Sequence, residues 1–75
     1  MADHTLDVSG LACPIPVLKA RKLLATLAPG STLEVLATSP TAEQDFIAFC
    51  DAAGHDLVSA DTNAVGSRLL IRRGP

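Results

Sequence analysis

Hydrophobic and polar residues alternate along this chain with two different periods. In four short stretches apolar residues recur at about every second position, which is the period of a strand with one buried face. They predict strands over residues 5–8, 32–37, 55–61 and 67–72. The residues expected to face the core from the clearest of these stretches are Leu6, Val8, Leu33, Val35, Ala37, Leu69 and Ile71.

In two longer stretches apolar residues recur every three to four positions, which predicts amphipathic helices. The first helix is expected from Pro14 to about Ala28, before the stop signal Ala28-Pro29-Gly30. The second begins at Ser39-Pro40 or at Thr41, because Thr41 and Gln44 have the spacing of a capping box. The expected apolar faces are Val17, Ala20, Leu23, Leu24 and Leu27 in the first helix, and Ala42, Phe46, Phe49, Cys50 and Ala53 in the second.

The predicted order of elements is β-α-β-α-β-β. A strand-helix-strand unit forms a parallel pair, and the last two strands are expected to form an antiparallel hairpin around residues 62–66. Each helix has a single apolar face, so both should cover the same face of the sheet. We therefore predict an α+β two-layer sandwich with a four-stranded mixed sheet, one face of which stays in contact with water.

Composition and charge narrow the class of protein. The 75 residues predict one domain, residues 1–75, and two cysteines are too few for a disulfide scaffold. The net charge of −2 and the lack of Tyr and Trp argue against nucleic-acid binding. His4, Cys13, Cys50 and His55 lack the short spacings of a metal site, so we expect no metal and no cofactor. Because no signal segment or apolar membrane span is apparent, we expect a cytoplasmic protein.

Cys13 is the strongest candidate for chemistry. It stands where the first predicted loop becomes a helix, and the sequence continues Pro14-Ile15-Pro16. Pro14 is expected at the first helical position, with Cys13 as the N-cap and the Ile15 amide as its hydrogen-bond donor. The helix dipole would favour the thiolate of Cys13, which is the reactive form. Cys50 lies on an apolar helical face and is expected in the core.

The segment from Gly10 to Pro16 resembles the CPxP signature of the TusA/SirA-like sulfur carrier proteins. Further similarities lie at Pro40, Asp45, Phe49-Cys50, His55-Leu57-Val58 and Leu70-Ile71-Arg72, so that the resemblance extends from His4 to Gly74. It implies a small β-α-β-α-β-β domain that carries sulfur as a cysteine persulfide on Cys13, with Pro14 and Pro16 framing the thiol. Because no general base, oxyanion hole or metal site can be assembled from these residues, we expect stoichiometric sulfur transfer rather than turnover by this chain itself.

The resemblance also implies partners. The donor would be a cysteine desulfurase or a rhodanese, and the acceptor a relay protein with a reactive cysteine. Downstream uses in the family are tRNA thiolation, molybdenum cofactor assembly and oxidation of sulfur compounds, and no membrane is involved. Contact points expected beside Cys13 are Leu11, Ile15, Lys19 and Lys22. Ser39, Gln44 and Ile15 stand where relatives often have charged residues, which alters the expected docking surface.

Two other classes of function can be weighed on the residues alone. A thiol-disulfide oxidoreductase normally needs a second cysteine, commonly two residues from the first, and the proline at residue 16 argues against this class. A protein- or RNA-binding regulatory module, in which Cys13 would be structural, needs no chemistry at all. We take the sulfur carrier as the leading hypothesis and the regulatory module as its alternative.

Overall fold

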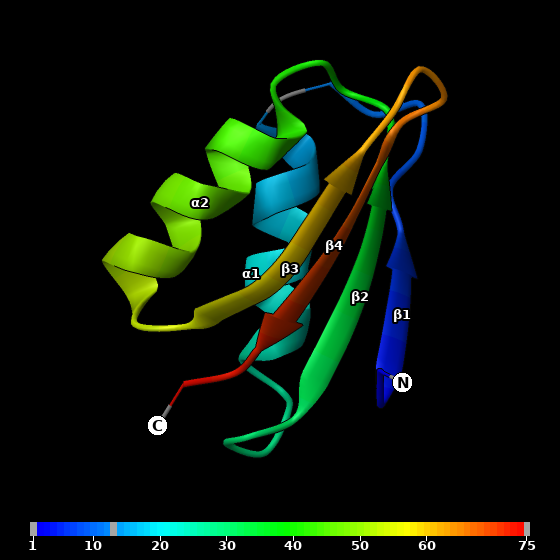
Figure 1. Ribbon diagram of the computed structural model, residues 1–75. Coiled ribbons are helices and arrows are strands. Elements are labelled where there is room, and N and C mark those ends of the chain that lie inside the picture. Colours follow the sequence, from blue (N-terminus) through cyan, green and yellow to red (C-terminus); the bar gives the residue numbers. More distant parts are fainter. Residues whose placement is uncertain (1, 13, 75) are drawn as a thin grey trace.

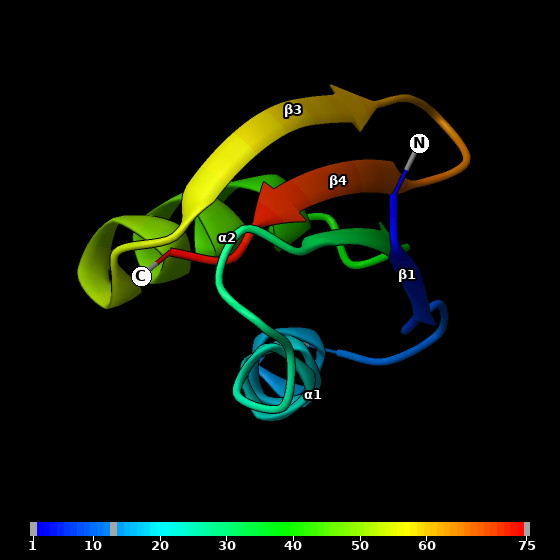
Figure 2. The ribbon, with the colours of Figure 1, turned by 90° about the horizontal axis from the view of Figure 1, so that it is seen from below.

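The computed structural model describes residues 2–12 and 14–74 as one mixed sheet packed against two helices. The elements are β1 (His4–Asp7), α1 (Ile15–Leu24), β2 (Thr32–Ala37), α2 (Ala42–Ala53), β3 (Asp56–Thr62) and β4 (Ser67–Arg72). The strand order is β1-β2-β4-β3, with β1 parallel to β2 and the other two neighbouring pairs antiparallel. The predicted fold class and element order are confirmed, and both helices lie on the same side of the sheet (Figures 1 and 2).

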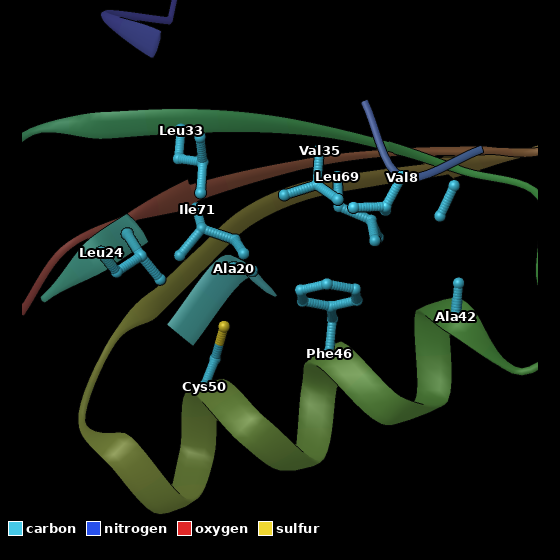
Figure 3. Packing of buried hydrophobic residues seen from close by; sticks show 11 residues of the cluster. Val8, Ala20, Leu24, Leu33, Val35, Ala42, Phe46, Cys50, Leu69 and Ile71 are labelled. Atoms are coloured by element: carbon cyan, nitrogen blue, oxygen red, sulfur yellow. The ribbon is translucent and has the colours of Figure 1, made fainter. Parts of the chain in front are cut away.

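The core lies between this sheet and the two helices. In β2 every second residue is fully or almost fully buried, and β4 continues the pattern because Leu33 pairs with Ile71 and Val35 with Leu69. Each helix buries residues four positions apart, which places them on one face. Those residues are Pro16, Ala20 and Leu24 in α1 and Ala42, Phe46 and Cys50 in α2. Figure 3 shows the α2 residues directed at the sheet.

The opposite face of the sheet is open, as predicted. Two ion pairs cross neighbouring strands there: Arg68 lies 3.5 Å from Glu34, and Arg72 lies 3.6 Å from Asp56. Both arginine side chains are more than half exposed, so these pairs contribute little to the free energy of unfolding. The side chains on this face are more polar than those on the helix-covered face, while the hydrogen bonds between the strands are common to both faces.

The first helix ends four residues before the predicted Ala28. Its carbonyl groups find partners outside the helix: the Thr26 hydroxyl donates to Leu23 O (2.7 Å), and the Arg73 Nε donates to Leu24 O (2.8 Å). Because these bonds replace a further helical turn, the chain can leave α1 at Leu24. Leu27 still packs against the core, as expected from the apolar pattern.

The second helix lacks the predicted capping box. Thr41 is the N-cap, but its hydroxyl donates to the Asp45 carboxylate (2.9 Å) instead of accepting from the backbone of Gln44. At the other end, Ala53 is exposed, although it was expected on the apolar face that buries Phe46 and Cys50. Gly54 then ends the helix with a φ of +77°, a conformation that glycine adopts without strain, as the sequence predicts.

The outer strands differ from their predicted bounds by one residue. β1 begins at His4, while Val8 continues its direction as a buried residue. β3 runs from Asp56 to Thr62 and is an edge strand with a bulge between Leu57 and Ser59. The bulge interrupts the alternation at Val58, which is half exposed. Among the described residues, neither helix has the length and apolar character needed to cross a membrane.

We predict that Phe46→Ala lowers the free energy of unfolding by about 3–5 kcal/mol, because the largest fully buried side chain of the core is removed. Urea denaturation followed by circular dichroism measures the change. Ile47→Ala is the matched control, since Ile47 is the next residue of α2 and is 50% exposed. Equal losses in the two variants would contradict this assignment of the core.

We also predict that the stability of the protein falls when the pH drops below about 6.5. The His55 Nδ1 accepts the Gly74 amide (2.9 Å), and burial, followed by the charge of Arg73, lowers the pKa of His55. The neutral form therefore stabilises the fold above the unfolded pKa, and this stabilisation is lost as the pH falls through the lowered folded pKa. Melting temperatures at pH 7.5 and 5.5 test this, and the difference should shrink in His55→Gln.

Candidate functional site

The candidate site is the connection from β1 to α1, which contains the CPxP motif. β1 and β2 are parallel, so their carboxyl ends meet at the same edge of the sheet, and this connection begins there. Cys13 itself lies outside the described residues. The site can therefore be built from the residues that precede and follow it, residues 8–12 and 14–22.

A tight turn precedes the cysteine. The Leu11 amide donates to Val8 O (3.2 Å), which closes a four-residue turn with Gly10 in its third position. Gly10 has a φ of +82°, the value that this position of a type II turn requires and that glycine adopts without strain. The Ser9 amide donates to the Asp7 carboxylate (2.9 Å), and hydrogen bonding by Ser9, first through its hydroxyl, lowers the pKa of Asp7.

One side chain ties this turn to the neighbouring strand. The Val8 amide donates to Leu36 O (2.8 Å), which extends the parallel ladder between β1 and β2 by one step. Two residues later the Gly10 amide donates to the Thr38 Oγ1 (2.8 Å). The sequence alone did not identify Thr38, because it lies 28 positions from Gly10 and their contact depends on the register of β1 and β2.

The helix begins one residue later than predicted. Pro14 is the N-cap of α1 rather than its first residue, and the Leu18 amide donates to Pro14 O (3.1 Å). The Ile15 amide, expected to bond the side chain of Cys13, donates to Ala12 O (3.0 Å) instead. This donor is therefore used by a backbone carbonyl that precedes the helix, and the expected bond to a side chain is replaced.

The two prolines of the motif have different surroundings. Pro14 is exposed, whereas Pro16 is buried and begins the inward stripe of α1 that continues with Ala20 and Leu24. Pro16 occupies the first turn of the helix, where the lack of an amide donor costs least. It therefore anchors the start of α1 to the core, while Pro14 stays at the surface beside the candidate thiol position.

The expected contact points separate into two groups. Leu11 packs against the core and is partly buried, so its role is largely structural. Ile15 is 43% exposed and Lys19 is also exposed, and Leu18, which was not among the expected contact points, is 51% exposed. Lys19 and Lys22 also line a shallow groove of about 340 Å³ with Leu6, Leu23 and Thr26, between α1 and β1. The start of α1 thus presents apolar and basic side chains side by side.

The charge near the start of α1 is favourable for an anion. The first turn of α1 has no acidic residue, whereas the first turn of α2 contains Glu43 and Asp45. Carboxylates interact favourably with the positive end of a helix dipole. In α2 this interaction is made by the helix's own first-turn carboxylates, whereas the first turn of α1 supplies none. An anionic group beside the N-terminus of α1 has no neighbouring carboxylate from that helix turn to repel it.

The second cysteine is in a different environment. Cys50 is only 3% exposed and points from α2 towards the sheet (Figure 3). Burial, with a smaller effect of the Asp56 carboxylate, raises the pKa of the Cys50 thiol to about 11. Cys50 is therefore a protonated core residue at neutral pH, as the sequence predicts. Within residues 2–12 and 14–74, no three His, Cys, Asp or Glu side chains gather as a metal site would require.

Known proteins resemble this chain both in sequence and in fold. The family model described as sulfurtransferase TusA matches residues 4–73. The crystal structure of a SirA-like protein from Desulfitobacterium hafniense is similar, with a TM-score of 0.83 and 27% sequence identity. That match covers 96% of this chain and 99% of the other. From these matches and the fold described above, the chain belongs to the TusA family of sulfurtransferases, as a TusA/SirA-like sulfur-carrier domain.

Proposed function

We propose that the protein carries sulfane sulfur as a persulfide on Cys13, with Pro14 and Pro16 framing the thiol. The observation that carries this proposal is the family match over residues 4–73, in a chain whose CPxP motif stands at the start of α1. The exposed Pro14 and Ile15, and the lack of an acidic residue in the first helical turn, support an accessible anionic sulfur. Cys50 is a poor alternative because its thiol is buried and protonated.

The proposed loading step is a thiol-persulfide exchange. The Cys13 thiolate attacks the outer sulfur of a donor persulfide, a new bond joins the Cys13 Sγ to that sulfur, and the S–S bond of the donor breaks. The donor cysteine leaves as a thiolate with the electron pair of that bond, and the proton of the persulfide remains on the transferred sulfur. One sulfur atom moves, and no external oxidant or reductant is needed.

Unloading repeats the same exchange in the other direction. The thiolate of an acceptor protein attacks the outer sulfur, and Cys13 leaves as a thiolate that the positive end of α1 stabilises. No general base or metal is needed in either step, so this chain acts as a stoichiometric carrier and turnover belongs to its partners. Both partners must reach the same atom, and the exposed Ile15, Leu18 and Lys19 are candidates for the surface that they share.

The donor that we propose is a cysteine desulfurase or a rhodanese, and the acceptor is a relay protein with a reactive cysteine. The compartment that suits a free thiol of this kind is the reducing cytoplasm. The sulfur would serve tRNA thiolation, molybdenum cofactor assembly or oxidation of sulfur compounds. These uses share the same first step, so the loading reaction is the one to test.

We predict that incubation with a cysteine desulfurase and L-cysteine, without reductant, adds one sulfur atom to the protein. Intact-protein mass spectrometry detects the added atom, and dithiothreitol should remove it. Cys13→Ser should gain no sulfur, whereas Cys50→Ala should gain as much as the wild type because Cys50 is a core residue. A rhodanese with thiosulfate serves as the second donor. Sulfur retained by Cys13→Ser, or no gain with either donor, would contradict the proposal.

A further prediction concerns the selectivity of alkylation. Iodoacetamide at pH 7.5 should modify Cys13 in the native protein and leave Cys50 unmodified, because a thiol with a pKa of about 11 is almost entirely protonated there. Peptide mass spectrometry distinguishes the two sites. Both should react once urea unfolds the chain, since Cys50 then loses its burial. Equal labelling of the two cysteines in the folded protein would contradict the assignment of Cys13 as the accessible thiol.

A further inference from the structure

Thr38 is the side chain that connects the segment before the CPxP motif to another element. It follows β2 directly, and its Oγ1 accepts the Gly10 amide at 2.8 Å. Within the turn, Ser9 bonds to Asp7 and Leu11 to Val8, and the first residue of the turn is paired with β2 through the Val8 amide and Leu36 O. The bond to Thr38 carries this attachment to β2 two residues further along the turn, to Gly10.

The position of Thr38 follows from the parallel ladder. In a parallel pair, successive hydrogen bonds from one strand come from every second amide. The Val8 amide bonds to Leu36 O, and the next donor in this series is Gly10. The chain leaves β1 at this point, so the hydroxyl of Thr38 takes the place that a backbone carbonyl would have in a longer strand. The side chain thereby extends the pairing as far as Gly10.

We infer that Thr38 is a positioning residue for the sulfur-transfer reaction: through Gly10 it fixes the backbone that leads into the CPxP motif. The inference rests on the proposed role of Cys13. Three residues separate Gly10 from Pro14, the N-cap of α1, and a buried Pro16 holds the helix start to the core. The described residues on both sides of the motif cysteine are thus tied down, Gly10 by Thr38 and Pro16 by its burial. Transfer between thiols depends strongly on such alignment of the reacting sulfur atoms.

The chain offers a matched control at the opposite end of the same strand. Thr32 is the first residue of β2, and its Oγ1 accepts the Asp3 amide at 2.9 Å. Like the bond between Gly10 and Thr38, it joins a backbone amide to a threonine hydroxyl and links β2 to the segment beside β1. The Thr32 Oγ1 also donates to the Asp3 Oδ2 at 3.4 Å, so Thr32→Val removes at least as much side-chain hydrogen bonding as Thr38→Val. It does so at the amino end of β1, far along the strand from the CPxP motif.

The experiment compares wild type, Thr38→Val, Thr38→Ser and Thr32→Val. Single-turnover transfer from a persulfidated cysteine desulfurase is measured over a range of donor concentrations, together with hydrogen exchange of the Gly10 amide by NMR. Thr38→Val should lower the maximal transfer rate at least about fivefold and leave the half-saturating donor concentration unchanged. It should also speed exchange at Gly10 about tenfold, as expected for loss of a hydrogen bond. Thr38→Ser retains the acceptor oxygen, and it and Thr32→Val should stay within about twofold of the wild-type rate.

Three results would overturn the inference: a wild-type maximal rate in Thr38→Val, equal slowing in Thr38→Val and Thr32→Val, or unchanged exchange at Gly10. A rise in the half-saturating concentration alone would make Thr38 a docking residue and would overturn it as well. Cys13→Ser is run beside these variants so that the two proposals can fail separately. Transfer by Cys13→Ser refutes the proposed function, whereas a fast Thr38→Val beside an inert Cys13→Ser refutes only the role of Thr38.

Discussion

The parallel pairing of β1 with β2 is the constraint on which the candidate site depends. Parallel neighbours cannot be joined by a tight turn, so the chain must leave the carboxyl end of β1 and return through a helix to the amino end of β2. The start of α1 is therefore placed at the edge where β2 also ends. That edge brings Gly10 within hydrogen-bond distance of Thr38, although neither residue belongs to a strand.

The start of α1 carries both core residues and the surface residues that we propose partners meet. Pro16, Ala20 and Leu24 face the sheet, so burial fixes the rotation of α1 about its own axis. Once that rotation is fixed, Ile15, Leu18 and Lys19 are necessarily at the surface. The same apolar stripe that stabilises the domain thus determines which side chains a partner would meet beside the CPxP motif. The rotation of α1 about its axis therefore links the packing of the core to the surface proposed for partners.

Most of the fold could be predicted because its signals are local. The alternation in residues 32–37 and 67–72 gave the bounds of β2 and β4 correctly, and Gly54 correctly marked the end of α2. The end of α1 was predicted wrongly because a distant residue intervenes. Arg73 bonds to Leu24 O across 49 positions of sequence, and no local pattern at residues 25–28 reveals it. The capping box failed for a local reason, since Asp45, four residues after Thr41, offers the Thr41 hydroxyl a carboxylate that a motif based on Gln44 ignores.

In the candidate site, too, the residues of a local motif could be predicted from the sequence, whereas a residue that depends on a distant contact could not. Cys13 and its two prolines stand out in sequence, whereas Thr38 is an ordinary threonine until the register of β1 and β2 is known. The structure also changes how the motif is understood. Prolines at positions 14 and 16 have no amide donor, and the Ile15 amide is already bonded to Ala12 O, so none of these three residues offers a free N–H to a sulfur anion. For the proposed carrier, stabilisation from this part of the turn then comes from the helix dipole, whose field acts without a directional bond. Such stabilisation favours the anion while leaving the outer sulfur free of a donor that an attacking thiolate would have to displace.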